Sequence, residues 1–167
     1  MKYKLSDICH YRKGKVDVSL LTDDTYISTE NMIPNRGGIT KASTLPTVDS
    51  TQLYKKGDIL VSNIRPYFKK IWQATCDGGC SNDVLVFQAN EGFDQDYLYY
   101  VLSDDAFFAY AMKTSKGTKM PRGDKHSIMQ YETEVCDLAT QRKIASLLKS
   151  IDSKIELNNA INNNLAA

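Results

Sequence analysis

Short apolar runs bounded by turn residues characterise much of the chain before residue 136. These runs are rich in β-branched and aromatic residues, a composition typical of strands. Glycine, asparagine and aspartate gather between them, as is typical of turns. The sequence DGG at 77–79 predicts a hairpin turn between two consecutive strands. The predicted strands are 26–27, 59–64, 70–76, 82–89 and 128–135.

Helices are predicted in two places within the same region. Between residues 94 and 112 apolar positions recur every three or four residues. Asp94 and Asp104 are of the type that caps helix N-termini, so this stretch predicts two helices or one broken helix. A shorter helix, capped by Ser6, is predicted over residues 3–13.

The segment from Leu138 to Leu165 contains neither glycine nor proline, and its apolar residues follow a longer period. Spacings of four, three and four residues make a heptad-like stripe, which is typical of paired helices. One helix of this length is about 42 Å long. Because asparagine is a poor helix former and recurs here, the helix needs a partner along the stripe. The predicted pairing positions are Ile144, Leu148, Ile151, Ile155, Asn158, Asn162 and Leu165.

Together these elements predict an α+β (mixed α/β) globular domain with short strands and peripheral helices over residues 1–136. A long C-terminal helix follows over residues 137–167 and is expected to form a coiled-coil-type pair. A chain of 167 residues has the usual size of one domain with an appendage.

The composition of the chain excludes several classes of protein. The N-terminus MKYKLSDIC lacks the apolar run of a signal peptide. No segment is long and apolar enough to span a bilayer. Four cysteines without a secretion signal indicate reduced thiols, so we expect a cytoplasmic protein with no membrane partner.

A formal net charge of +1 conceals an uneven distribution of charge along the chain. Residues 55–70 hold five cations and one acid, and residues 113–125 again hold five cations and one acid. Residues 77–105, between them, hold seven acids and neither Lys nor Arg. We expect one positive and one negative face. A single basic run is usually solvated surface, but two such runs in loops indicate a surface that faces phosphates.

Side chains suited to reading bases lie within or near the basic runs. Asparagine and arginine form paired hydrogen bonds with base edges in the major groove. Tyr67 and Phe68 can pack against sugars or thymine methyl groups, although aromatic residues at the start of a strand are more often part of the core. The candidates for reading bases are Asn31, Asn35, Asn63 and Arg65.

Motifs for catalysis are sparse. The two histidines lack metal-ligand spacing, and Cys76 and Cys80 have no second pair with which to complete a zinc site. No phosphate-binding glycine loop or serine-nucleophile sequence is present. Asp58 and Asp83 could join other acids in a magnesium-dependent nuclease site, but acids after turns more often cap those turns. A binding protein is therefore a better hypothesis than an enzyme.

Five segments of the chain are more specific in combination than any one of them is alone. They are TYISTENMIPNRGGI (25–39), KKGDILVSNIRPYFKKI (55–71), CSNDVLVF (80–87), KGTKMPRGDKHSI (116–128) and ATQRKIASLLKSIDSKIELNNAIN (139–162). In this order they resemble the specificity (S) subunits of type I restriction-modification systems. The chain departs from that family at Cys136, where a proline usually precedes the long helix. It resembles one half of a family member, which usually carries two recognition domains and two such helices.

The resemblance implies a function and a set of partners. Each recognition domain of the family reads one half of a split site in double-stranded DNA, and two long helices pair antiparallel to hold the domains apart. Modification subunits, which bind S-adenosylmethionine and methylate adenine, and restriction subunits assemble on this scaffold. The resemblance also implies a second specificity half, or a second copy, as a partner through the C-terminal helix. No cofactor, metal or catalytic residue is expected in this chain itself.

The resemblance further implies which residues meet DNA. Pro66 is expected to hold Arg65 extended and facing the duplex, while Lys69 and Lys70 contact phosphates. Thr118, Lys119 and Arg122 are expected to reach into a groove. The full set of predicted DNA-binding positions is Asn31, Asn35, Arg36, Asn63, Arg65, Tyr67, Lys69, Lys70, Lys116, Thr118, Lys119, Arg122 and Lys125.

Two alternatives from other classes stay open on sequence grounds. One is a magnesium-dependent DNA nuclease that uses Asp58 and Asp83. The other is a homodimeric scaffold built on the C-terminal helix, without a nucleic-acid role.

Overall fold

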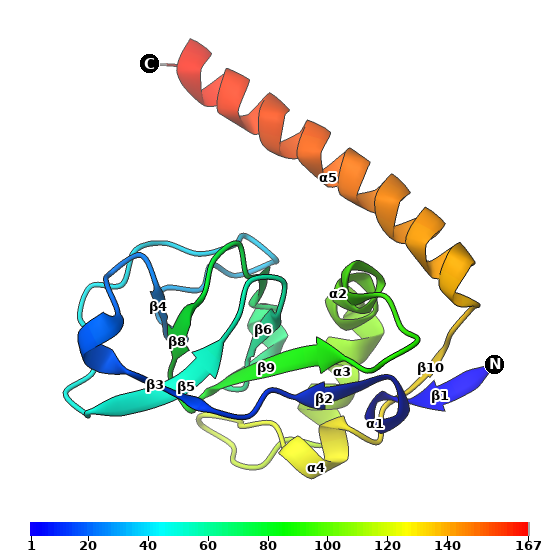
Figure 1. Ribbon diagram of the computed structural model, residues 1–167, viewed down its shortest axis with the longest axis horizontal. Coiled ribbons are helices and arrows are strands. Elements are labelled where there is room, and N and C mark those ends of the chain that lie inside the picture. The colour runs from blue at the N-terminus through cyan, green and yellow to red at the C-terminus, as the bar shows by residue number, and fades with distance from the viewer. Residues whose placement is uncertain (167) are drawn as a thin grey trace.

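Two four-stranded sheets, a two-stranded ribbon and a set of helices make up the computed structural model, which describes residues 1–166 (Figure 1). The strands are β1 (Lys2–Lys4), β2 (Cys9–Tyr11), β3 (Lys15–Asp17), β4 (Tyr26–Ile27), β5 (Ser50–Tyr54), β6 (Ile59–Ser62), β7 (Ile71–Gln73), β8 (Gly78–Cys80), β9 (Val84–Ala89) and β10 (Glu132–Glu134). The helices are α1 (Leu5–Ile8), α2 (Gln95–Ser103), α3 (Asp105–Lys113), α4 (Lys125–Ile128) and α5 (Leu138–Leu165), with 3-10 turns η1 (Val18–Leu20) and η2 (Pro66–Phe68).

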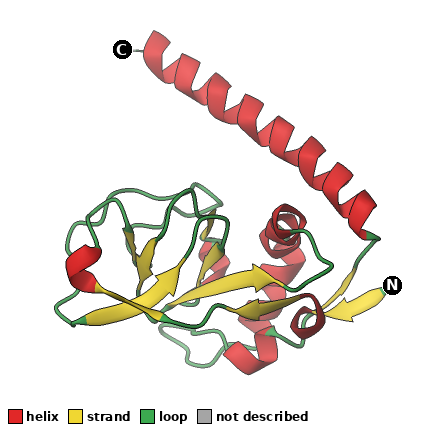
Figure 2. Ribbon diagram, in the orientation of Figure 1, coloured by secondary structure: helices red, strands yellow, loops and turns green. Residues whose placement is uncertain are grey.

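The first sheet has the strand order β2-β9-β6-β7, and the second has the order β3-β5-β8-β4. Every neighbouring pair is antiparallel except β4 and β8, which are parallel. The ribbon pairs β1 with β10 and so joins the N-terminus to the segment that precedes α5. Helices α1, α2 and α3 lie on the side of the N-terminus, and the second sheet lies on the opposite side (Figure 2).

Strand β6 is buried along its whole length because both of its faces are covered. Ile59 and Val61 belong to the core that the first sheet shares with helices α1 to α4. Leu60 points the other way and packs with Ile27 and Tyr54 of the second sheet. A strand covered on both faces reads as a continuous apolar run, as this one does.

The predicted mixed α/β fold with a long C-terminal helix is confirmed. The stretch after residue 94 forms two helices, as one of the two readings predicted. Asp94 accepts a hydrogen bond from the Tyr97 amide at 2.9 Å, and Asp104 accepts one from Ala106 at 2.7 Å. The predicted strands at 26–27, 59–64, 70–76 and 82–89 correspond to β4, β6, β7 and β9.

The predicted helix over residues 3–13 is wrong. That segment is strand β1, the single turn α1 and strand β2. Leu5 and Ile8 are buried on α1, but the residues after them take an extended conformation because they pair with β9 at the edge of the first sheet. The predicted strand at 128–135 is only β10, since α4 and a turn occupy its first half.

The predicted hairpin turn at 77–79 is also wrong. Gly78 and Gly79 lie within β8, between β4 and β5, and β7 and β9 each pair with β6 rather than with one another. A Cβ atom on Gly78 would lie 2.2 Å from the Thr25 carbonyl oxygen and 2.4 Å from the Tyr54 hydroxyl. These glycines therefore permit close approach between strands and do not form a turn.

Helix α5 begins against the globular domain at a buried glutamine. Gln141 is 1% exposed, accepts a hydrogen bond from the Asp94 amide at 2.9 Å and donates one to the Cys136 carbonyl at 2.8 Å. Ala145, one turn later, is also buried. The side chain of Gln141 thus joins the start of α2 to the start of α5.

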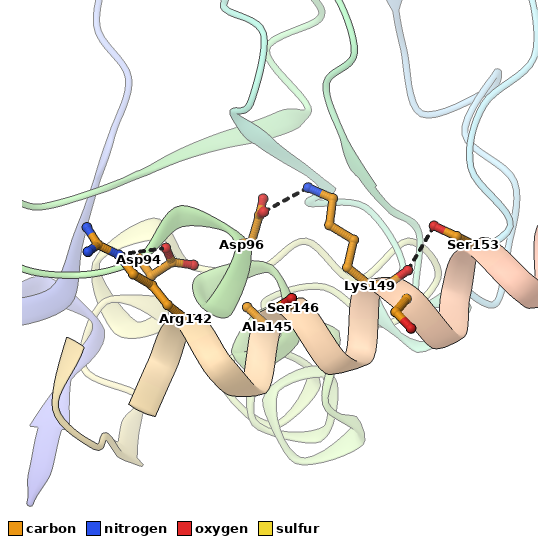
Figure 3. Close-up of a pocket in the computed structure, with 8 residues that line it drawn as sticks. Asp94, Asp96, Arg142, Ala145, Ser146, Lys149 and Ser153 are labelled. Carbon is orange, nitrogen blue, oxygen red and sulfur yellow. Dashed lines mark hydrogen bonds and ion pairs between the residues drawn. The ribbon is translucent and has the colours of Figure 1, made fainter. Parts of the chain in front are cut away.

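Polar contacts extend the junction between α2 and α5 for three more turns. Lys149 pairs with Asp96 at 2.7 Å, and the Tyr100 hydroxyl donates to Asp152 at 2.7 Å. Figure 3 shows the pocket of about 380 Å³ beside this junction, with Lys149 reaching toward Asp96 and Arg142 toward Asp94. The helix beyond Asp152 projects away from the domain (Figure 1).

The predicted apolar stripe of α5 lies beside the docking face and not within it. Ile144, Ile151 and Ile155 are 38%, 45% and 52% exposed, whereas Gln141 and Ala145 are buried. The polar stripe positions Asn158 and Asn162 are exposed, as is Leu165, and Leu148 is half-buried. The pairing role of the stripe and the boundary at 136/137 stay predictions. None of the helices within residues 1–166 is long and apolar enough to cross a bilayer.

Replacing Gln141 by leucine tests the joint between the domain and α5. The change leaves the Asp94 amide and the Cys136 carbonyl without their partner, so the free energy of unfolding should fall by about 1–3 kcal/mol. Urea unfolding followed by circular dichroism measures this. Arg142→Ala is the control, because this exposed side chain lies 3.8 Å from Asp94 and should contribute less than about 0.5 kcal/mol. Equal losses in the two variants would contradict the role given to Gln141.

Candidate nucleic-acid interface

Three loops that lie far apart in the sequence meet at the end of strand β6. We call residues 31–40 loop L1, residues 63–70 loop L2 and residues 114–124 loop L3. Together they contain every predicted DNA-binding position except Lys125, which directly follows L3. The structure therefore brings the predicted site together around one strand end.

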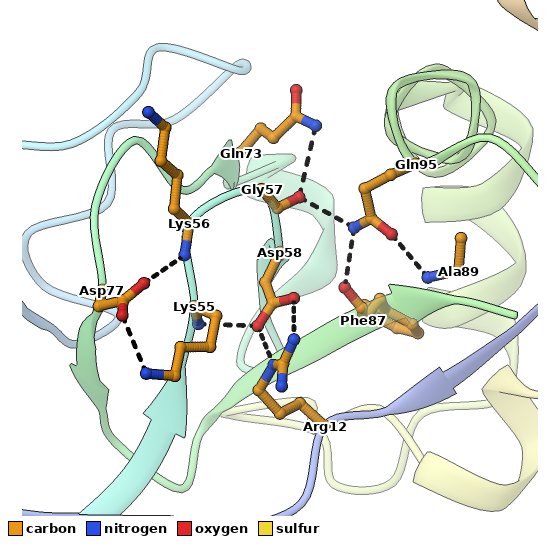
Figure 4. Close-up of polar contacts among 10 residues, drawn as sticks. All are labelled: Arg12, Lys55, Lys56, Gly57, Asp58, Gln73, Asp77, Phe87, Ala89 and Gln95. Atoms are coloured by element: carbon orange, nitrogen blue, oxygen red, sulfur yellow. Dashed lines mark hydrogen bonds and ion pairs between the residues drawn. The ribbon is translucent and has the colours of Figure 1, made fainter.

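Loop L2 starts directly from the buried strand β6. Its base is closed by a hydrogen bond from the Ser62 amide to the Lys70 carbonyl at 3.1 Å. At the other end of β6, Asp58 is 2% exposed and accepts hydrogen bonds from the Arg12 guanidinium and, at 2.8 Å, from the Lys55 amide (Figure 4). The strand that carries L2 is therefore held at both ends.

Loop L1 lies on L2 through the backbone. The Asn35 amide donates to the Phe68 carbonyl at 2.8 Å, and the Arg36 amide donates to the Lys69 carbonyl at 2.9 Å. Two consecutive hydrogen bonds fix both the position and the direction of one loop relative to the other.

Loop L3 is attached to L2 on its other side. The Arg65 amide donates to the Pro121 carbonyl at 2.8 Å, and Ile64 and Arg122 form an antiparallel bridge. Asn63 and Gly123 are joined twice, through the Gly123 amide and the Asn63 side-chain amide, both at 3.0 Å. A Cβ atom on Gly123 would lie 2.4 Å from Asn63 Oδ1, so the contact needs glycine.

Two of the four candidates for reading bases hold the loops and do not face solvent. Asn63 is 4% exposed and Asn31 is 5% exposed. The side-chain amide of Asn31 donates to the carbonyls of Tyr26 and Thr40, both at 3.0 Å. We correct the prediction for both residues: their side-chain amides donate to backbone carbonyls inside the loops and do not face solvent, where a base would lie.

The backbone of L1 and L2 is strained at four positions. Within residues 1–166, the non-glycine residues with positive φ are Asn35, Arg36, Arg65 and Lys69, at 54°, 60°, 49° and 51°. This conformation is unfavourable for residues with a Cβ atom and clusters at functional sites. The expectation that Pro66 holds Arg65 extended is wrong, because Arg65 is left-handed and its amide is held by L3.

Loop L2 also carries two buried polar atoms that lack a hydrogen-bond partner within the described chain. They are Asn63 Oδ1 and Arg65 Nε. Buried polar groups are nearly always paired, so unpaired ones call for an explanation. Both atoms lie beneath the surface of the strained loop, two residues apart.

Several predicted cations are paired with carboxylates of the same chain. Asp105, the first residue of α3, contacts Arg36 at 2.5 Å and Lys69 at 2.8 Å. Lys116 pairs with Asp124 at 2.8 Å, and the pKa of the Asp124 carboxyl is lowered by this contact and by hydrogen bonds from Ser127. Arg122 pairs with Asp83 at 2.9 Å.

The expected separation into one positive and one negative face is therefore wrong. Asp83 and Asp105 belong to the acidic stretch 77–105, yet both reach into the basic loops. The fold places acidic side chains next to the basic loops because α3 packs on η2 and β9 runs beside β6. The loops expose charged groups of both signs at short range.

Other predicted side chains stay available at the surface. Thr118, Lys119 and Lys125 are exposed, and no hydrogen bond or ion pair of their side chains occurs within residues 1–166. Tyr67 is 47% exposed and stacks obliquely on Phe68, with ring centroids 4.7 Å apart.

Lys70 and Met120 complete the surface of the loops. Lys70 donates to the Thr29 carbonyl at 2.6 Å, and burial lowers the pKa of its ammonium group. Met120, at the tip of L3, is 53% exposed and was not predicted. The sequence feature that could have predicted it is a large apolar side chain between Lys119 and Pro121 in a basic loop.

A family model described as the type I restriction modification DNA specificity domain matches residues 1–167. The chain belongs to this family. The description of this family names DNA specificity and no catalysed reaction, in agreement with the expectation that the chain is not an enzyme.

Known proteins are similar to this chain in sequence or in fold. The type I restriction enzyme HindI specificity subunit of Haemophilus influenzae is 26% identical over 98% of this chain and 38% of its own length. The crystal structure of the HsdS subunit from Thermoanaerobacter tengcongensis is 18% identical, with a TM-score of 0.72 over 96% of this chain and 44% of that one. A chain from work on complex assembly and conformational transition of the type I R-M system has a TM-score of 0.73, 18% identity and the same coverage. The specificity domain spans less than half the length of these relatives.

The nuclease alternative finds no support in the arrangement of acids in the specificity domain. Asp58 precedes β6 and Asp83 precedes β9, so antiparallel pairing puts them at opposite ends of the ladder. Each is paired with an arginine. Within the described part of the chain, no group of three His, Cys, Asp or Glu side chains is placed to hold a metal ion.

The carboxyl group of Asp105 should titrate far below its ordinary range. Hydrogen bonds from Lys69 and Arg36 lower its pKa to about 2, against an ordinary value of about 3.9. A lowered pKa stabilises the fold above pH about 4, and this contribution is lost as the pH falls toward 2. The Asp105 Cγ chemical shift, followed by NMR, measures the midpoint. In Lys69→Ala the midpoint should rise toward 3.9; a midpoint near 4 in the wild type would contradict the contact.

Proposed function

We propose that this chain recognises one half of a bipartite site in double-stranded DNA, as the specificity component of a type I restriction-modification system. The single observation that carries the proposal is the convergence of L1, L2 and L3, with their strained backbone, on one end of the rigid strand β6. A set of loops mounted on a stiff strand can hold side chains in the register that base reading demands.

Different side chains serve different parts of this function. Arg65 is the candidate for base edges, because its backbone amide and carbonyl are both held by hydrogen bonds while its side chain is only half-buried. Asn35, at the strained turn of L1, is a second candidate. Lys119 and Lys125, which are exposed, and Lys70 are candidates for phosphates, and Tyr67 for a sugar or a thymine methyl group.

The partners follow from the same proposal. Modification subunits would supply S-adenosylmethionine and the methyl transfer to adenine, and restriction subunits would cut the DNA, so this chain needs no cofactor or metal of its own. A second specificity half, or a second copy of this chain, would pair with the exposed apolar stripe of α5. The support is the exposure of Ile151, beside the last contact with the domain, and of Ile155, on the part of the helix that projects from it.

Binding to a duplex should show the two kinds of contact separately. Neutralising four to five phosphates would make the log-log slope of affinity against salt about −4. Lys119→Ala should weaken binding to every sequence alike, whereas Arg65→Ala should relax the preference at one position by about 1–3 kcal/mol. Fluorescence anisotropy with a duplex selected from a random pool, and with the unselected pool, measures both effects.

Lys2→Ala is the matched control for the two DNA-contact variants. Lys2 is exposed on strand β1, where its backbone pairs with Glu134 of β10, and it belongs to none of the three loops. Removal of this charge should leave the preference and the salt slope unchanged. Unchanged affinity of Arg65→Ala and Lys119→Ala for all duplexes would overturn the assignment of the loops to DNA.

The apolar stripe of α5 should mediate association. Ile155→Asp puts a charge on the stripe at a position 52% exposed, so it should break the pair and leave the domain folded. Light scattering measures the mass, and thermal unfolding at low concentration checks the fold. Ala160→Asp introduces the same charge on the opposite face of α5 and is the control. Loss of the fold in Ile155→Asp, or loss of mass in both variants, would contradict pairing through the stripe.

A further inference from the structure

One carboxylate links the two strained loops of the candidate interface. Asp105 Oδ1 lies 2.5 Å from Arg36 Nη2 and 2.8 Å from Lys69 Nζ. Arg36 belongs to L1 and Lys69 to L2, and both have positive φ. The two cations therefore converge on a single oxygen that comes from neither loop.

The Oδ1 atom of Asp105 belongs to a side chain at the surface. The side chain of Asp105 is 71% exposed, so the carboxylate is open to anything that approaches the loops. Arg36 is held from behind as well, because its Nε donates to the Ser103 carbonyl at 2.7 Å and its guanidinium lies over the Phe108 ring at 5.6 Å. The guanidinium thus keeps its place whatever anion it contacts.

An arginine and a lysine that converge on one exposed anionic oxygen provide the donor set that binds a phosphate oxygen of nucleic acid. Single ion pairs occur twice more at this surface, where Asp124 pairs with Lys116 and Asp83 with Arg122. Asp105 differs from them because it alone of the three contacts two cations from two loops.

We propose that Asp105 occupies the place of a DNA phosphate in the free protein and thereby lowers the affinity of Arg36 and Lys69 for any duplex. This inference rests on the proposed DNA-binding function and adds a residue that limits binding through phosphates alone. Every duplex must displace an internal carboxylate that is already in place. A duplex of the wrong sequence offers only phosphates, whereas a correct duplex adds base contacts elsewhere on L2 that offset the displacement.

Asp105→Asn tests the proposal in the full 167-residue chain. Two cations lose their internal anion and become available to phosphates, so affinity for an unselected mixed-sequence 20-bp duplex should rise about three- to tenfold at low salt. Solution anions would replace the carboxylate and be released on binding, so the log-log salt slope should become steeper by about one. Affinity for a selected duplex should rise by a similar factor, because both duplexes displace the same carboxylate.

Asp104→Asn is the matched control. It removes the same charge from the neighbouring residue, and asparagine can keep the cap that Asp104 forms with the Ala106 amide. Only a general effect of charge should appear in this variant. The triple variant Arg36→Ala/Lys69→Ala/Asp105→Asn provides a second test, because the gain from Asp105→Asn should vanish when its two cations are absent.

The outcomes separate this inference from the proposed function. A larger gain in Asp105→Asn than in Asp104→Asn, abolished in the triple variant, supports the role of Asp105. Equal changes in the two single variants, or weaker binding in Asp105→Asn, would show that the residue only shapes the loops and would overturn the inference alone. A wild-type chain with no salt-dependent affinity for either duplex would overturn the proposed function together with it.

Discussion

The burial of strand β6 on both faces is the constraint on which the rest of the structure depends. Helices cover one face and the second sheet covers the other, so the strand cannot shift without disrupting two cores at once. Asp58 and Asn63, directly before and after the strand, are both buried and hydrogen-bonded. Loop L2 is therefore attached to the least movable part of the domain, and L1 and L3 are attached to L2. A surface that reads sequence needs this order of attachment, because small displacements of a side chain change its base contact.

Sequence periodicity predicted those parts of the fold that depend on local pattern. Strand β6, the two helices with aspartate caps and the long C-terminal helix were all predicted, because each has a period or a cap that is visible in its own residues. Failures occurred where a distant partner decides the structure. Gly78 and Gly79 resemble a turn, but neighbouring strands need the space of their missing side chains. Strands β3 and β5 were not predicted, since they are short and largely polar and take their conformation from pairing within the second sheet.

The candidate site was predictable in location more than in detail. Cations and glycines in loops predicted that these segments form one surface, and the structure brings the segments together. The roles of Asn31 and Asn63 could not be predicted, because an asparagine side chain satisfies a buried backbone group as well as it reads a base. Nor could the pairing of Arg36 with Asp105, residues 69 positions apart, follow from charge runs. Opposite charges that are separated in the sequence are neighbours in the fold. The surface of the free protein therefore carries less net positive charge than the basic residues of its loops would give it alone.

The contacts between α2 and the first half of α5 give this helix the properties of a lever. Gln141, Lys149 and Asp152 hold its first turns on α2, while its last turns extend from the domain. A tilt of about 10° after Asp152 would displace the tip of the free segment, about 20 Å long, by roughly 3 Å. Along a duplex this is about one base-pair step. The stiffness of this junction would thereby determine how sharply a paired assembly distinguishes targets whose two halves differ in separation by one base pair.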